Sequence, residues 1–212
     1  MAIDYRTESL NRYLEDAASA RPTPGGGSVA AVAGALATTM AAMAAGFTAG
    51  KERFKDVEPE IREHLGRLAE IREALLASAH EDMDVYQNIM AALKMPKETD
   101  DHASARREAL RRATRASLDV VGQVRDAAGE VLTIARRLAD IANPNLISDV
   151  GVAAELALGA VRAAGVNTVV NLAGYKDEED AAAVRRKTDA VVADAERLAD
   201  ETREIVLGKL NK

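Results

Sequence analysis

The hydrophobic positions of this chain recur at helical spacing, and no segment alternates with the period of two that marks a half-buried strand. The clearest series starts just after Pro59 and ends at Met95-Pro96, which predicts one long amphipathic helix between two prolines. Its apolar positions lie three or four residues apart, or at sums of these steps: Ile61, Leu65, Leu68, Leu75, Ala79, Met83, Tyr86 and Met90.

The same spacing predicts three other amphipathic helices. A short helix covers about residues 7–20, and its apolar side is formed by Leu10, Leu14 and Ala17. An Arg-rich helical region ends near residue 140, and Gly122 and Gly129 are its candidate breaks. A final helix covers about residues 177–207.

Two segments lack the polar face of the others. Residues 22–50 carry no charge, and the stretch from Ser148 to Leu172 holds few charged residues. By count the first is long enough to span a bilayer, but Ala, Gly and Thr dominate it and weaken its transfer into lipid. We therefore expect two helices buried on most sides within the protein, the first ending near Gly46 or Gly50.

These elements predict an all-α fold, a single-domain bundle of six to eight helices spanning residues 1–212. The 212 residues are 48% hydrophobic but only 3% aromatic, so the core must be built from small aliphatic side chains on closely packed helices. Two largely apolar helices are difficult to cover in one copy of a bundle this small. We therefore expect a homodimer, the alternative being that both helices lie at the centre of a monomer.

Charge and composition exclude several functions. A net charge of −6 argues against general nucleic-acid binding, which needs a basic surface. The chain has no Cys, and its three His lack zinc-binding spacing, so no metal site is expected. The N-terminus lacks the apolar core of a signal peptide. We expect a cytoplasmic protein with no membrane or nucleic-acid partner.

The segment Pro22-Thr23-Pro24-Gly25-Gly26-Gly27-Ser28 is the most informative local motif. Its glycines permit positive φ or a close backbone approach, and Ser28 is placed to cap the apolar helix that follows. A Gly-rich loop at a helix N-terminus can bind an anionic or carbonyl-bearing ligand. The alternative is a tight turn into a buried helix. A phosphate-binding loop is excluded, because no Lys-Ser/Thr follows the glycines and no strand precedes them.

Other polar residues interrupt apolar surfaces. Asp82 falls within the apolar stripe of the long helix, where a carboxylate must be paired, hydrogen-bonded or open to a cleft. It is either a structural partner, of a helix N-terminus or a neighbouring Arg, or a functional acid. Ser148 and Asp149 fit the cap and first turn of the second apolar helix. Asn167 and Asn171 share one face of that helix, where they bond each other or backbone, or line a pocket.

Basic residues cluster after the long helix. Lys94 and Lys97 flank Met95-Pro96. Arginines then recur along the next helix, at Arg106, Arg107, Arg111, Arg112 and Arg115. These side chains form either a solvated helix face or a surface for the acidic tail of a ligand.

Three motifs in this order resemble the cyclodeaminase/cyclohydrolase family, over nearly the whole chain. They are the Gly-rich segment, the stretch from Asp82 through Tyr86 to Lys97, and the stretch from Asn145 through Ser148 to Gly174. The family includes the formiminotetrahydrofolate cyclodeaminase domain and stand-alone methenyltetrahydrofolate cyclohydrolases. The resemblance implies an all-α dimer with a folate site in a groove between helices, and neither a metal nor a redox cofactor.

The resemblance also implies residue roles. The family's central acid corresponds to Asp82, with Asp149 as the second candidate for the catalytic carboxylate. The family often has Phe at the position of Tyr86, so that hydroxyl is not expected to be essential. The expected substrate-binding residues are Gly25, Gly26, Gly27, Ser28, Tyr86, Lys94, Lys97, Ser148, Asn167 and Asn171.

No formiminotransferase-like segment precedes these motifs, so we expect the cyclohydrolase, which hydrolyses 5,10-methenyltetrahydrofolate to 10-formyltetrahydrofolate in one-carbon metabolism. One carboxylate can stabilise the cationic amidinium carbon and accept a proton from the attacking water. The alternative is the cyclodeaminase, which expels ammonia from formiminotetrahydrofolate and needs an acid for that leaving group. A second alternative, of a different class, is a non-catalytic helical scaffold or regulatory dimer.

Overall fold

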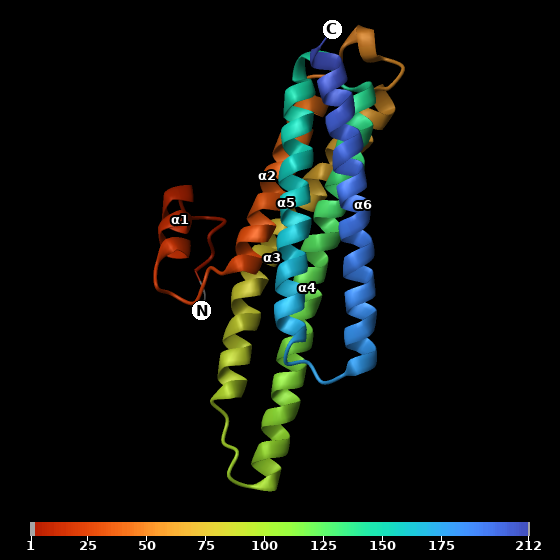
Figure 1. The fold of residues 1–212 in the computed structure, drawn as a ribbon. Coiled ribbons are helices and arrows are strands. Elements are labelled where there is room, and N and C mark those ends of the chain that lie inside the picture. Colours follow the sequence, from red (N-terminus) through yellow and green to blue (C-terminus); the bar gives the residue numbers. More distant parts are fainter. Residues whose placement is uncertain (1–2, 212) are drawn as a thin grey trace.

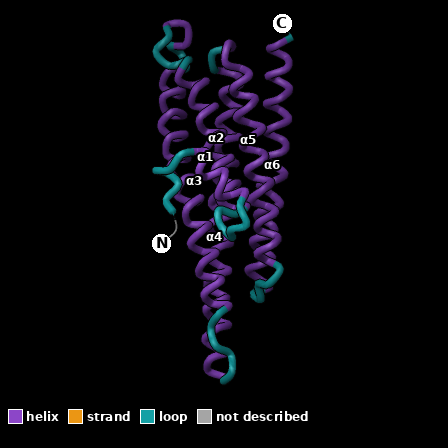
Figure 2. The backbone as a smooth tube through the Cα atoms, turned by 90° about the vertical axis from the view of Figure 1, so that its left-hand side faces the viewer, coloured by secondary structure: helices purple, strands orange, loops and turns teal. Residues whose placement is uncertain are grey.

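The computed structural model describes residues 3–211, and its regular structure is helical throughout (Figure 1, Figure 2). Six α-helices and no strand occur in that range, which confirms the expected all-α fold. Short 3-10 turns at Glu52–Phe54 and Pro144–Leu146 precede two of the helices. The six helices are α1 (Leu10–Ala18), α2 (Gly26–Gly46), α3 (Glu58–Leu93), α4 (Asp100–Ile141), α5 (Ile147–Leu172) and α6 (Glu178–Leu210).

Helix α2 is surrounded by α3, α5 and α4, and α4 in turn packs against α6 (Figure 1). The helices differ in where they begin and end along the bundle. The α3–α4 hairpin extends past the start of α2 and past the loop that joins α5 to α6 (Figure 1). A face of α4 that α2 and α5 cover in the middle of the bundle is therefore uncovered lower down.

Small side chains allow α2 to pack closely against its neighbours. A Cβ atom at Gly34 would lie 3.1 Å from Leu75 Cδ1 and 3.6 Å from the Cβ of Ala160, so the glycine permits the three helices to approach. Many alanines of α2 and α5 are fully buried: Ala31, Ala37, Ala41, Ala44, Ala45, Ala153, Ala157 and Ala160. The expected core of small aliphatic residues is confirmed. Because protein interiors are closely packed, larger side chains at these positions would force the helices apart.

Helix α1 lies beside the bundle, and the side it buries is not the expected one (Figure 1). Leu10 is 66% exposed and Leu14 is 55% exposed, whereas Tyr13 and Asp16 are buried. The Asp16 carboxylate accepts hydrogen bonds from the Tyr5 hydroxyl and from two guanidinium groups, those of Arg12 and Arg21. These partners replace the lost water, so a charged residue occupies the buried side.

Two expected helix caps are wrong. The N-cap of α2 is Gly25, and Ser28 is the third residue of the helix. Helix α5 begins at Ile147, directly after the 3-10 turn, so Ser148 lies inside its first turn. The candidate breaks at Gly122 and Gly129 are also wrong, because α4 continues through both without interruption. In each case packing against other helices decides the local structure.

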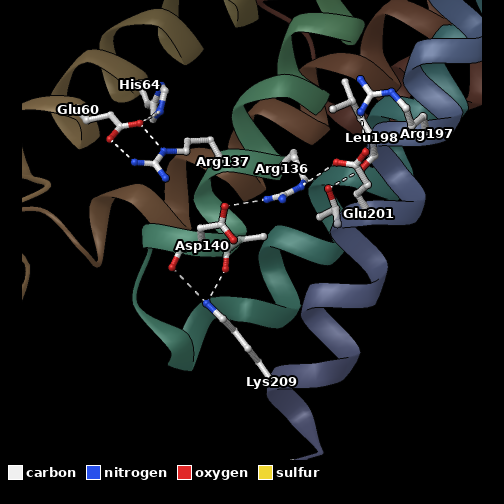
Figure 3. Close-up of polar contacts among 11 residues, drawn as sticks. Glu60, His64, Arg136, Arg137, Asp140, Arg197, Leu198, Glu201 and Lys209 are labelled. Atoms are coloured by element: carbon white, nitrogen blue, oxygen red, sulfur yellow. Dashed lines mark hydrogen bonds and ion pairs between the residues drawn. The ribbon is translucent and has the colours of Figure 1, made fainter.

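Ion pairs join α3, α4 and α6 at the end of the bundle opposite the α3–α4 turn (Figure 3). Arg137 pairs with Glu60 of α3 at 2.6 Å, and Arg136 pairs with Glu201 of α6 at 3.1 Å. Lys209 donates to the backbone carbonyl of Ala139 at 2.6 Å. Partly exposed pairs contribute at most about 1 kcal/mol each, so they mainly align α6 with α4.

Candidate functional site

The carboxylate of Asp82 meets the N-terminus of α2. Its Oδ2 atom accepts a hydrogen bond from the backbone N–H of Ser28 at 2.9 Å. The N-cap residue Gly25 has no side chain to satisfy the free N–H groups of the first turn, so Asp82 of α3 supplies the acceptor. The helix dipole adds a favourable interaction with the negative charge.

Gly27 lies where Asp82 approaches the backbone of α2. A Cβ atom built on Gly27 would overlap the Asp82 carboxylate and lie 2.6 Å from its Cγ. Of the glycines in residues 3–211, Gly50 alone has positive φ, so backbone conformation is not the reason for these glycines. The close approach of Asp82 is the reason at Gly27, and the Asn167 side chain, at 3.3 Å from a Cβ position on Gly26, limits the space there.

Asp82 is half-buried and has no cationic partner in the described part of the chain. Burial raises the pKa of its carboxyl group above the ordinary value of 3.8, and the Ser28 N–H opposes that shift. Of the two structural roles considered for Asp82, the contact with a helix N-terminus is present, whereas an ion pair with a neighbouring Arg is not. The site therefore holds a desolvated acid that lacks a counter-charge.

Two amides of α5 extend this polar site. The Asn167 side chain lies against Gly26, since a Cβ there would be 3.3 Å from Asn167 Oδ1. Its Nδ2 atom donates to the carbonyl of Ala163 at 2.9 Å, which leaves Oδ1 as an acceptor at the end of α2. One turn further on, Asn171 Nδ2 donates to Ser117 Oγ of α4 at 2.8 Å. Four helices thus contribute polar groups at one level of the bundle.

Two residues of this site, Ser117 and Tyr13, were not predicted from the sequence. Ser117 is a buried hydroxyl on the Arg-rich helix, and only its contact with Asn171 reveals it. Tyr13 of α1 is buried, and its hydroxyl lies 3.1 Å from Ser28 Oγ. Burial raises the pKa of the Tyr13 phenol, and the Ser28 hydrogen bond opposes that shift while the nearby Asp82 charge adds to it. Tyr13 lies on the side of a short helix that the sequence pattern predicts to be polar. The spacing of apolar residues therefore does not identify it.

A cavity of about 250 Å³ opens on the α1 side of Ser28. Its walls are mainly apolar, with phenol, hydroxyl and imidazole groups among them. Tyr13, Ser28, Val32, Leu76, His80 and Met83 are among its lining residues, whereas Asp82 is not. The space is therefore bounded by α2 and α3 on one side and by the α1 segment on the other.

The remaining predicted residues lie at three other places. Tyr86 is one helical turn below Asp82 on α3 and is 36% exposed. Lys94 and Lys97 are exposed at the α3–α4 turn, and Lys94 is about 18 Å along the helix axis from Asp82. Asp149, with its neighbour Ser148, is at the other end of α5, about 27 Å from Asn167 along that helix. Asp82 and Asp149 therefore do not meet within one chain.

The polar groups and the negative charge of the site suit a polar, positively charged ligand. Asp82 offers a negative charge and a proton acceptor, while Asn167, Asn171 and Ser28 offer hydrogen-bonding groups around it. No group of three or more His, Asp or Glu side chains within residues 3–211 could hold a metal ion.

Comparisons with known proteins identify a consistent set of relatives. The model of the formiminotransferase-cyclodeaminase family matches residues 9–190. A methenyltetrahydrofolate cyclohydrolase of Methylorubrum extorquens is 31% identical over 204 residues, which are 96% of this chain and 98% of the relative. The formimidoyltransferase-cyclodeaminase of Rattus norvegicus is 25% identical over 95% of this chain, which spans 37% of that longer protein. The crystal structure of formiminotetrahydrofolate cyclodeaminase from Thermotoga maritima has a TM-score of 0.88 and 28% identity, covering 96% of this chain and 98% of that one.

Proposed function

The chain belongs to the formiminotransferase-cyclodeaminase family, and on that premise we propose that it hydrolyses 5,10-methenyltetrahydrofolate to 10-formyltetrahydrofolate. The observation that carries this proposal is the half-buried carboxylate of Asp82, which has no counter-charge within residues 3–211, at the N-terminus of α2. The methenyl group is a cationic amidinium carbon between two nitrogens, so the substrate brings the counter-charge that the site lacks. The relative from Methylorubrum extorquens, which matches over its full length, bears the same activity in its name.

The reaction needs one proton acceptor and groups that orient water. Water adds to the methenyl carbon, and its proton passes to the Asp82 carboxylate. The bond from that carbon to N5 then breaks, the new hydroxyl loses its proton to become the formyl carbonyl, and Asp82 returns a proton to N5. One proton is released overall. Asn167 and Ser28 lie where they would hold the pterin ring or the attacking water.

The test is an absorbance assay on the purified protein. We expect loss of the methenyl chromophore well above the spontaneous rate, and loss of that acceleration in Asp82→Asn. A protein that binds folate without accelerating hydrolysis would contradict the proposal and favour the scaffold alternative.

The cyclodeaminase reaction is the second candidate, because the similar crystal structure from Thermotoga maritima, which covers 96% of this chain, is that of a formiminotetrahydrofolate cyclodeaminase. That reaction closes the ring and expels ammonia from formiminotetrahydrofolate, so it needs a protonated acid. The raised pKa of Asp82 is compatible with this role as well. Ammonia release from the formimino substrate, measured beside the hydrolysis assay, separates the two activities.

We further propose that the protein acts as a homodimer through the outer face of α2 and α5. Each helix has a row of exposed positions seven residues apart, the spacing of a helix–helix seam. The row on α2 is Val29, Leu36 and Met43, and the row on α5 is Val152, Gly159 and Val166. The two helices pack against each other, and we propose that a second copy covers both rows as one face.

A two-fold axis at the middle of this face would account for the position of Asp149. Gly159 is exposed, has nothing within 4 Å of its Cβ position, and lies at the centre of the row. If two α5 helices cross there in opposite directions, Asp149 and Asn167 lie about 15 and 12 Å from the crossing point. The partner subunit's Asp149 would then approach the level of Asn167. This arrangement gives Ser148 and Asp149 their proposed role in the substrate site.

The remaining properties are part of the same proposal. We place the protein in the cytoplasm, with a folate substrate, no cofactor, and neither a nucleic-acid nor a membrane partner. Helix α2 is long and apolar enough to cross a membrane by length and composition, and half of that stretch is buried inside the bundle. We attribute its apolar outer face to the dimer contact.

A further inference from the structure

The N-terminal arm, residues 3–18, is held together mainly by its own contacts. Its centre is the Asp16 carboxylate, which is buried and accepts three hydrogen bonds. The donors are Tyr5, Arg12 and, just after the arm, Arg21. The rings of Tyr5 and Tyr13 pack edge-on with their centres 5.2 Å apart. Because a buried charge must keep its partners, the arm has the internal order of a unit that can move as one body.

The attachment of the arm to the bundle is much weaker. Within residues 3–211 a single hydrogen bond joins the two, that of 3.1 Å between the Tyr13 hydroxyl and Ser28 Oγ. The ion pairs of the arm link its residues to one another or to Arg21. Leu10 and Leu14 are largely exposed and pack little against the bundle. A segment with so few buried contacts opens at a lower free energy than the bundle unfolds.

The contact between the arm and the bundle is also incomplete. The cavity of about 250 Å³ lies between them and is lined by residues of the arm, α2 and α3. His80 lines it from α3, and its buried Nδ1 atom has no hydrogen-bond partner among residues 3–211. Unfilled space and an unsatisfied buried nitrogen both cost free energy. The arm's own contacts therefore favour its closed position only weakly.

Movement of the arm would uncover the Asp82 site. Burial raises the pKa of the Tyr13 phenol and the charge of Asp82 adds to that shift, so the two side chains lie close together. Ser28, which contacts the Tyr13 hydroxyl, also donates its N–H to Asp82. Residues 19–22 after the arm are exposed, whereas Pro24 at the start of α2 is buried. The arm can thus turn about residues 19–22 while α2 stays in place.

We propose that the N-terminal arm is a lid on the Asp82 site, which opens as one body to admit a folate and closes over it; the proposal rests on the proposed function. In the open position water solvates the Asp82 carboxylate. Closure replaces that water by Tyr13, so the attraction between the carboxylate and a cationic methenyl carbon becomes stronger. Bound folate therefore shifts the arm to the closed position, and opening controls the exchange of substrate and product.

Thiol labelling measures the opening, because the chain has no Cys of its own. Ala79 is 7% exposed and lines the cavity beneath the arm, so the thiol of Ala79→Cys is shielded while the arm is closed. Ser78→Cys is the matched control, because Ser78 is 4% exposed on the same turn of α3 but does not line the cavity. The probe is fluorescein maleimide, which is too large to enter the cavity.

We expect the probe to label Ala79→Cys about tenfold or more faster than Ser78→Cys. Saturating 5-formyltetrahydrofolate, a stable folate, should slow the labelling of Ala79→Cys about tenfold and leave the control unchanged. Adding Tyr13→Phe removes the one hydrogen bond to the bundle. Without folate, it should speed the labelling of Ala79→Cys about fivefold and leave that of Ser78→Cys unchanged.

The outcomes separate this proposal from the proposed function. Equal labelling rates for Ala79→Cys and Ser78→Cys would overturn the lid and leave the hydrolysis proposal standing. A labelling rate of Ala79→Cys that either folate or Tyr13→Phe leaves unchanged would do the same. The expected labelling pattern in a protein that does not accelerate hydrolysis would instead overturn the proposed function and leave the lid intact.

Discussion

Within residues 3–211, Asp82 accepts a hydrogen bond from one backbone N–H and pairs with no cation, so the fold does not stabilise its charged and neutral forms equally. Burial raises the pKa of the carboxyl group above 3.8, which means that folding favours its neutral form. This contribution to stability is complete below the unfolded pKa and is lost as the pH rises through the raised pKa. At neutral pH the charged group therefore weakens the fold until a cationic substrate compensates it.

The substitution Asp82→Asn keeps an oxygen for the Ser28 N–H and removes charge and basicity. We expect kcat to fall by a factor on the order of 10² or more. The melting temperature should equal or exceed that of wild type at neutral pH, and the difference should shrink as the pH approaches 3.8. Thermal melts across this range, with turnover on the same samples, provide the check. A destabilised variant with normal turnover per folded molecule would rule out the catalytic role.

The two glycines at the start of α2 should respond differently to alanine. In Gly27→Ala the methyl group overlaps the Asp82 carboxylate, so we expect a loss of about 1–3 kcal/mol in stability and most of the activity. In Gly26→Ala the methyl group would meet only the Asn167 amide at 3.3 Å, which can shift, so the fold should persist. Denaturant melts and the hydrolysis assay compare them. Wild-type activity in Gly27→Ala would show that Asp82 need not contact α2.

At the scale of elements, residues 3–18, which include α1, form the N-terminal arm beside the bundle. This arm contacts the site through one side chain, that of Tyr13. Tyr13→Phe removes the hydroxyl that contacts Ser28 Oγ, so we expect turnover to fall several-fold with about 1 kcal/mol lost in stability. Tyr5→Phe is the matched control, because its hydroxyl bonds Asp16 on the same arm without touching Ser28. If both variants lose stability equally and keep full turnover, the arm only supports the fold.

Helical periodicity predicted the long helices because their burial follows a regular stripe. The series from Ile61 to Met83 is the buried side of α3, and Asp82 stands out against that stripe. The same reasoning failed for α1, whose Leu10 and Leu14 are exposed while a paired carboxylate is buried. A nine-residue helix has too few positions for a stripe to decide its orientation, and the partners of Asp16 come from outside it.

Only part of the site could be predicted from the sequence, because local patterns do not show which distant segments come into contact. Asp82 and the glycines were found because each breaks a local pattern. Their contact joins residues 54 positions apart, and no local rule gives that distance. Ser117 and Tyr13 break no pattern at all, so only the packing of four helices around the end of α2 identifies them.

At the scale of the whole molecule, the proposed dimer makes the outer face of α2 and α5 a functional surface. Gly159→Glu places a charge at its centre, and we expect dimer dissociation to increase by about a hundredfold, because a buried unpaired charge costs several kcal/mol. Gly66→Glu, an exposed helical glycine of α3 with nothing near its Cβ position, is the control. Light scattering measures the molar mass of each variant and so distinguishes a dimer from a monomer. An active, dimeric Gly159→Glu protein would contradict this interface.

The few aromatic side chains have an optical consequence. The chain has four Tyr and no Trp, so its ultraviolet emission comes from tyrosine alone. Tyr13 contacts Ser28, Tyr86 follows Asp82 by one turn, and Tyr5 packs edge-on against Tyr13 at 5.2 Å, whereas Tyr175 lies in the loop between α5 and α6. Three of the four tyrosines thus lie around the proposed substrate site, and none is in the rows of α2 and α5 that we propose for the dimer contact. Unlabelled protein can report ligand occupancy by quenching, without interference from its state of assembly.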